Sequence, residues 1–131
     1  MSTNDSDDGD RTPRRETPAT ILLAEDDRAF RETLRFWLTD NGYYQIREAS
    51  NGEQAIASVD ETVDVLVVDR QMPKLPGAEV VERLDGTSFD GTVIVLSARR
   101  PDKRLSRDDV AEYLLKPVDH QLFLDALDRY L

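Results

Sequence analysis

The chain has 131 residues, of which 27 are acidic and 17 are basic, and its net charge is −10. This length fits one domain that can bury a core without metal or disulfide staples. Because the sequence contains no cysteine, a disulfide framework, a thiolate metal site and a cysteine nucleophile are all excluded. The negative charge opposes direct binding to nucleic acid or to an anionic membrane, and it favours a basic partner or a metal-bearing ligand.

The amino-terminal segment, residues 1–18, is polar and lacks apolar periodicity, so we expect a disordered leader before one domain at residues 19–131. No apolar run is long enough to span a bilayer, and no secretory signal is present, so we expect a cytoplasmic protein. Only three of the 17 basic residues are lysines. This acid-rich usage, with arginine preferred to lysine, resembles the halophilic proteins of high-salt cytoplasms.

From residue 20 onward, short apolar runs alternate with segments of helical periodicity. The runs predicted to be strands are TILLA, YYQIREA, VDVLVV, TVIVL and EYLL, at residues 20–24, 43–49, 63–68, 92–96 and 112–115. Helical faces are predicted at residues 30–38, 55–59, 80–84 and 123–131. Strands that alternate with helices imply a parallel sheet covered on both faces, and right-handed crossovers leave few topologies.

Two helix boundaries have local signals. The pair Asn41-Gly42 is typical of a helix end and closes the first helix. Asn51, followed three residues later by Gln54, predicts a helix N-cap with a capping-box partner.

Polar residues stand at the carboxyl ends of the predicted strands, where ligands gather in open α/β sheets. In strand order they are Glu25, Asp26 and Asp27, then Asp69, then Ser97, and finally Lys116 with Pro117. Clustered carboxylates raise one another's pKa unless a cation joins them, and Mg²⁺ prefers such oxygen ligands. With this ion in place, Asp69 could act as a nucleophile toward a phosphoryl group that also contacts Ser97 and Lys116.

Each of these residues alone has an ordinary structural explanation. An acidic triplet arises readily in an acid-rich chain or as a helix cap, and the aspartate at the end of a strand often only caps a turn. Lys116 is more informative, because a lysine in a chain that prefers arginine indicates a need for a compact point charge. The joint arrangement is what favours a phosphoryl site.

The motifs ILLAEDD, VVDRQMPKLPG, LSA and YLLKP occur in this order across residues 19–131. Together they resemble the receiver domain of the response regulators of two-component systems. The resemblance implies an α/β, flavodoxin-like fold: a doubly wound five-stranded parallel sheet in the order 2-1-3-4-5 with helices on both faces. It implies phosphorelay signal transduction, in which the domain takes a phosphoryl group from a histidine kinase and signals to an unknown downstream protein by a surface switch. The chain would be no enzyme beyond catalysing its own phosphorylation and dephosphorylation.

The resemblance also assigns the acceptor and the metal ligands. Asp69 matches the phosphoacceptor, which would become a 4-aspartylphosphate. Asp26 and Asp69 match direct ligands of Mg²⁺, joined by the backbone carbonyl of Gln71, while Glu25 would act mainly through water. Asp27 then remains as a helix cap.

Three further positions match the family's switch. Ser97 and Lys116 would contact the phosphoryl group together with the acceptor. Ser97 would turn toward that group and vacate space that Tyr113 fills, which moves the outer face. Pro117 matches a proline whose cis peptide bond aims the lysine. The single histidine, His120, is predicted to be a surface residue and no phosphodonor site.

The chain departs from the family pattern between Ser97 and Lys116, where it is a few residues shorter. Asp109-Val110 replaces the usual Gly-Ala, so RRPDKRLSRDD, residues 99–109, predicts a short or irregular fourth helix. This questions the family's usual output and dimer face, between the fourth and fifth helices, and leaves a homodimer open.

Two other functions stay open. A non-phosphorylated pseudo-receiver would serve only as a protein-binding module; the complete acceptor set speaks against it, and the shortened fourth helix speaks for it. A magnesium-dependent phosphohydrolase typically carries a second aspartate two residues after its nucleophile, where this chain has Gln71.

Overall fold

Five parallel strands form one sheet in the order β2-β1-β3-β4-β5, which confirms the predicted topology. The computed structural model describes residues 18–131, so all of the predicted leader except its last residue lies outside the described residues. The strands are β1 (Thr20–Ala24), β2 (Gln45–Ala49), β3 (Val65–Asp69), β4 (Thr92–Ser97) and β5 (Glu112–Leu115). The helices are α1 (Arg28–Asp40), α2 (Gly52–Ser58), α3 (Gly77–Arg83) and α4 (His120–Tyr130), with 3₁₀ turns η1 (Leu84–Gly86) and η2 (Arg107–Asp109).

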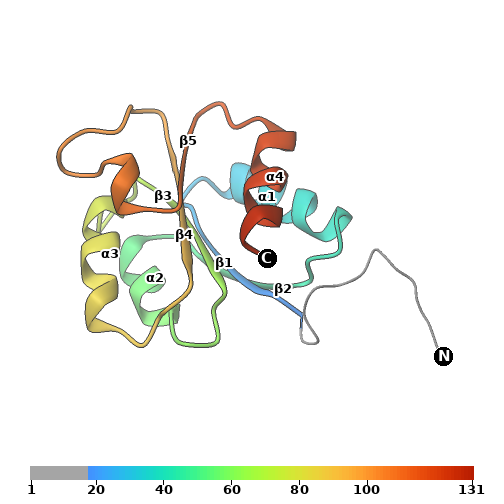
Figure 1. Ribbon diagram of the computed structural model, residues 1–131, viewed down its shortest axis with the longest axis horizontal. Coiled ribbons are helices and arrows are strands. Elements are labelled where there is room, and N and C mark those ends of the chain that lie inside the picture. The colour runs from blue at the N-terminus through green and yellow to red at the C-terminus, as the bar shows by residue number, and fades with distance from the viewer. Residues whose placement is uncertain (1–17) are drawn as a thin grey trace.

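Helices cover both faces of the sheet, with α2 and α3 on one side and α1 and α4 on the other (Figure 1). The alternation of β3 explains the two cores, because Leu66 and Val68 pack with α2 and α3, whereas Val65 and Val67 pack with α1 and α4. All five residues of β3 are buried. Each such aliphatic side chain contributes about 1.5–3 kcal/mol on burial, so the strand that ends at the predicted acceptor is firmly held.

The helix boundaries follow their local signals. Asp27 caps α1 by accepting a hydrogen bond from the N–H of Phe30, as predicted. After α1, Gly42 adopts a φ of 90°, which glycine tolerates best. Asn51 caps α2 by accepting a hydrogen bond from the N–H of Gln54, as predicted. The capping box differs from the prediction, because the Gln54 side chain accepts from the N–H of Ser50 and not from the N–H of Asn51.

The connection between β4 and β5 contains no α-helix, which confirms the prediction that the helix expected there is short or irregular. Its only regular element is the 3₁₀ turn η2, which a capping box between Ser106 and Asp109 closes. Leu105, only 1% exposed, anchors this connection in the core on the α2 and α3 side. Among residues 18–131, none of the helices is long and apolar enough to cross a membrane.

Candidate functional site

Three carboxylates meet at the carboxyl edge of the sheet. Glu25 directly follows β1, Asp69 ends β3, and these two strands are paired neighbours. Glu25, Asp26 and Asp69 offer carboxylate oxygens that all lie within 4.8 Å of one another. Glu25 is 1% exposed and Asp69 is 4% exposed, whereas Asp26 faces solvent. The predicted acidic pair and the predicted acceptor therefore form one cluster, in which Asp26 is the exposed member.

The ammonium of Lys116 lies between the two buried carboxylates. Its Nζ is 3.2 Å from Glu25 Oε1 and 3.2 Å from Asp69 Oδ2. Burial opposes the charged form of Lys116, but the attraction of Asp69 and Glu25 outweighs it and raises the pKa of the ammonium. Lys116 follows β5, and its peptide bond to Pro117 is cis, as the family resemblance implies. We call Glu25, Asp26, Asp69 and Lys116 the acceptor cluster.

The electrostatics of the cluster favour a bound cation. Burial raises the pKa of Glu25 to about 7, the N–H of Asp27 opposes this rise, and the charge of Asp69 adds to it. A hard divalent ion would relieve the repulsion between the carboxylates. The donor set fits Mg²⁺, because it consists of carboxylate oxygens and has one solvent-facing member, Asp26, beside which the ion can keep water ligands.

A cavity of about 540 Å³ opens beside the acceptor cluster, and its lining includes Asp26, Gln71 and Arg99. The N–H of Gln71 donates to Asp69 Oδ1 at 3.3 Å, so the segment after β3 turns back over Asp69. Gly77 permits this close turn, because a Cβ there would lie 2.5 Å from the carbonyl oxygen of Asp69. Two of the predicted metal-binding residues, Asp26 and Gln71, thus border open space in which a phosphodonor could approach.

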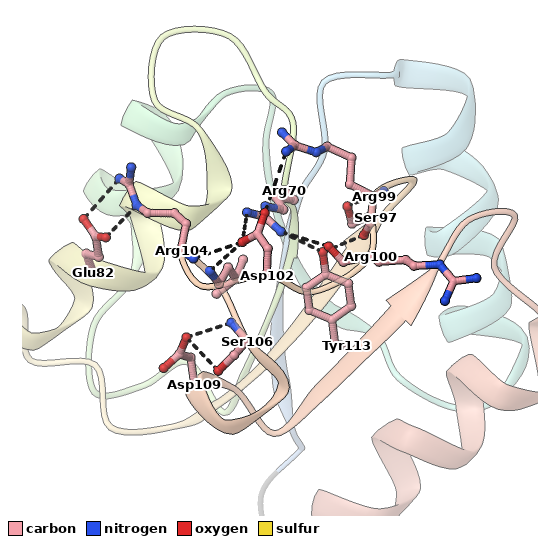
Figure 2. Close-up of polar contacts among 11 residues, drawn as sticks. Arg70, Glu82, Ser97, Arg99, Arg100, Asp102, Arg104, Ser106, Asp109 and Tyr113 are labelled. Carbon is pink, nitrogen blue, oxygen red and sulfur yellow. Dashed lines mark hydrogen bonds and ion pairs between the residues drawn. The ribbon is translucent and has the colours of Figure 1, made fainter.

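The predicted switch residues Ser97 and Tyr113 are linked through the backbone of Arg99 (Figure 2). Ser97 Oγ accepts from the N–H of Arg99 at 2.9 Å, and the Tyr113 hydroxyl donates to the carbonyl of Arg99 at 2.7 Å. Ser97 is fully buried and Tyr113 is 3% exposed. Tyr113 is therefore an inward-facing core residue, although β5 is an edge strand of the sheet.

Two arginines near the cluster, the half-buried Arg31 and the buried Arg70, were not among the predicted site residues. Arg31 donates to the backbone carbonyl of Glu25 and pairs with Glu48. Arg70, which directly follows Asp69, is only 6% exposed. A sequence signal existed for Arg70, since a charged residue that extends a buried strand needs partners, but no pattern identified them. His120 stacks on Trp37 with 4.7 Å between ring centroids and is no part of the cluster.

Comparison with known proteins agrees with this geometry. The model of the response regulator receiver domain family matches residues 21–128. The response regulator MprA of Mycobacterium tuberculosis is 41% identical over 101 residues, which cover 74% of this chain and 44% of that protein. A Haloferax volcanii protein named "Putative transcriptional regulator" is 30% identical over 118 residues, which cover 90% of this chain and 20% of that protein. The chain thus spans less than half the length of either relative.

Among the solved structures that are similar in fold, one contains a magnesium ion. It is the receiver domain of a sensor histidine kinase from Pseudomonas aeruginosa PAO1, with a magnesium ion coordinated in its active-site cleft. The TM-score is 0.76 at 22% identity, covering 87% of this chain and 98% of that one. Sheet order, acceptor cluster and family match agree, and this chain belongs to the response regulator receiver domain family.

Proposed function

We propose that this receiver domain takes a phosphoryl group from a histidine kinase on a carboxylate oxygen of Asp69, with Mg²⁺ bound. The observation that carries the proposal is the contact of Lys116 with the buried carboxylates of both Asp69 and Glu25. A lysine placed there balances an acceptor that must stay ionised to attack. A domain that only bound proteins would have no need of this costly buried arrangement.

Each residue of the site has a separate role in the proposed phosphoryl transfer. An oxygen of Asp69 forms a bond to phosphorus while the phosphorus–nitrogen bond of the kinase phosphohistidine breaks, and the electron pair returns to the imidazole. Lys116 and the hydroxyl of Ser97 would contact the transferred oxygens. The backbone carbonyl of Gln71, with Asp26 and Asp69, would hold Mg²⁺, which when bound neutralises charge on the phosphoryl group.

The remaining roles belong to the same proposal. Glu25 would act on the metal mainly through water, and Ser97 with Tyr113 would pass the change to an outer surface that a downstream protein reads. The chain would catalyse only its own phosphorylation and dephosphorylation. We also propose a cytoplasmic, high-salt setting, which the cysteine-free, acid-rich composition supports. A homodimer and direct contact with nucleic acid are not needed for this function.

Intact-protein mass spectrometry tests the proposal. Wild type, Asp69→Asn and the matched surface variant Asp85→Asn are incubated with Mg²⁺ and a small phosphodonor at high salt. We expect a gain of one phosphoryl group in wild type and in Asp85→Asn, and none in Asp69→Asn. No gain in any sample, together with no binding of Mg²⁺, would overturn the proposal and favour the pseudo-receiver. A gain that persists in Asp69→Asn would place the acceptor elsewhere.

A further inference from the structure

Arg70 lies one residue after the proposed acceptor, and its side chain contacts Tyr113 of β5 and the connection between β4 and β5 (Figure 2). Its Nη1 donates to the Tyr113 hydroxyl at 3.0 Å, and its Nη2 donates to Asp102 Oδ1 at 2.7 Å. Nη1 also lies 3.4 Å from the backbone carbonyl of Arg100. One buried guanidinium thus touches the switch aromatic of β5 and the loop that precedes it.

Asp102 is the residue that organises this loop, which we define as residues 98–111. Its Oδ1 accepts from the N–H of Arg104 at 3.0 Å and from the N–H of Leu105 at 3.1 Å, in addition to Arg70. The loop contains no α-helix, so this carboxylate takes the place of helical hydrogen bonds at its turn. Arg70 therefore holds the loop through the side chain on which the loop's own shape depends.

The Tyr113 hydroxyl is fully used in this arrangement. It accepts from Arg70 and donates to the carbonyl of Arg99, whose N–H in turn donates to Ser97 Oγ. Hydrogen bonds on both sides of the Arg99 backbone therefore connect the Ser97 hydroxyl to Tyr113 and, through Tyr113, to Arg70. Were Tyr113 to turn outward, the buried guanidinium would lose one of its partners, and an unpaired buried donor is strongly disfavoured.

The surroundings of Arg70 stabilise its protonated form. Burial opposes the protonated form, but the hydrogen bonds to Tyr113 and Asp102 outweigh this effect and raise the pKa of the guanidinium. The ion pair with Asp102 is buried on the arginine side, where 6% of the side chain is exposed, so salt screens it less than an exposed pair.

We propose that Arg70 is a positioning residue that holds Tyr113 inward, with loop 98–111 closed over it, before any phosphoryl group is attached. This inference rests on the proposed function, in which the inward position of Tyr113 belongs to the phosphorylated state. Tyr113 then already occupies the inward position before phosphorylation, and a phosphoryl group on Asp69 has only to reorient Ser97. A domain whose competent state is already populated binds its ligand without a conformational cost.

The test compares Arg70→Met, which keeps the aliphatic stem, with Arg104→Met as the matched control. Arg104 belongs to the same loop but pairs with Glu82 at the surface. Hydrogen exchange measured by mass spectrometry, without metal or phosphodonor, reports the loop alone. We expect exchange at residues 99–106 to become about tenfold faster in Arg70→Met, because a charge-assisted hydrogen bond is lost, and to change little in the control.

A second readout separates positioning from mere support of the loop. Beryllofluoride with Mg²⁺ serves as the phosphoryl analogue, and its affinity is measured for wild type, Arg70→Met, Tyr113→Phe and the double variant. We expect each single variant to bind about five- to tenfold more weakly, with no further loss in the double variant, because both changes break the same contact. In Arg70→Met, beryllofluoride should restore slow exchange in the loop.

Three results would overturn the inference. Unchanged loop exchange in Arg70→Met would show that Arg70 does not hold the loop, and additive losses in the double variant would show that it does not act through Tyr113. If Arg70→Met failed to fold, Asp102→Asn would take its place, and unchanged loop exchange there would count equally against the inference. A wild-type chain that bound no beryllofluoride would instead overturn the proposed function, while the exchange data would still decide whether Arg70 holds the loop.

Discussion

The acceptor cluster lies at the carboxyl edge of the sheet, and loop 98–111 leaves that edge after β4, but the two regions are held in different ways. Glu25 and Asp69 sit at the ends of two paired strands, whose register places them side by side. The loop, in contrast, is held mainly by side chains: Arg70 with Asp102, and Leu105 in the core. The hydrogen bonds between paired strands fix the geometry of the cluster, whereas the loop depends on individual side-chain contacts.

The two regions also differ in charge. The cluster concentrates buried carboxylates around one lysine, while the segment from Arg99 to Arg107 carries five basic residues and one acidic residue in an otherwise acidic chain. A buried charge that loses its partner costs several kcal/mol, but an exposed pair contributes little. Substitutions in the cluster should therefore have large effects on function, and those in the loop should range from large at its core anchor to small at its surface.

The largest effect is expected from Lys116→Met, which removes the cation shared by Glu25 and Asp69. The transferred oxygens lose a preorganised positive group, and losses of this kind lower rates by about 10²–10³-fold. The initial rate of phosphorylation, followed by intact-protein mass spectrometry, measures this loss. The exposed loop residue Lys103 provides the control, since Lys103→Met should leave the rate unchanged. A wild-type rate in Lys116→Met would show that the ammonium serves folding only.

The next effect concerns the stability of the loop. Leu105 is 1% exposed and packs in the core on the α2 and α3 side, so Leu105→Ala should lower the free energy of unfolding by about 2–5 kcal/mol. Urea denaturation measures this change, with Leu122→Ala as the control because Leu122 is 59% exposed. Equal effects of the two variants would contradict the view that the loop is anchored in the core.

The same contrast explains what could be predicted from the sequence. Strand-end positions follow from period and order along the chain, so Glu25, Asp69, Ser97 and Lys116 could be assigned to one edge before the structure was known. The shortened segment after Ser97 predicted a short or irregular helix before the last strand, and the connection between β4 and β5 contains only a 3₁₀ turn. The partners of Arg70 could not be predicted, because Asp102 lies in a loop whose path no periodicity describes, and no sequence pattern indicated that the Tyr113 hydroxyl reaches Arg70 from β5.

A substitution at Gly77 tests how tightly the turn after β3 closes over Asp69. A Cβ at this position would meet the Asp69 carbonyl oxygen at 2.5 Å and Arg70 Cα at 2.6 Å, so backbone must move. We expect Gly77→Ala to destabilise the fold by about 1–3 kcal/mol, measured by urea denaturation. Gly86→Ala is the matched control, because a Cβ there meets nothing within 4 Å. If both variants kept wild-type stability, the turn would be looser than the structure indicates.

The smallest effect is expected at the surface of the loop, from Arg104→Gln. Arg104 Nε lies 2.8 Å from Glu82 Oε2, but both side chains are 55% exposed, so solvent screens the pair. We expect a loss of less than about 1 kcal/mol at low salt that disappears at high salt. Denaturation of wild type and variant at both salt concentrations gives this difference. A loss that persisted at high salt would mean that the Arg104 stem, rather than its charge, supports the loop, and that the loop depends on packing beyond Leu105.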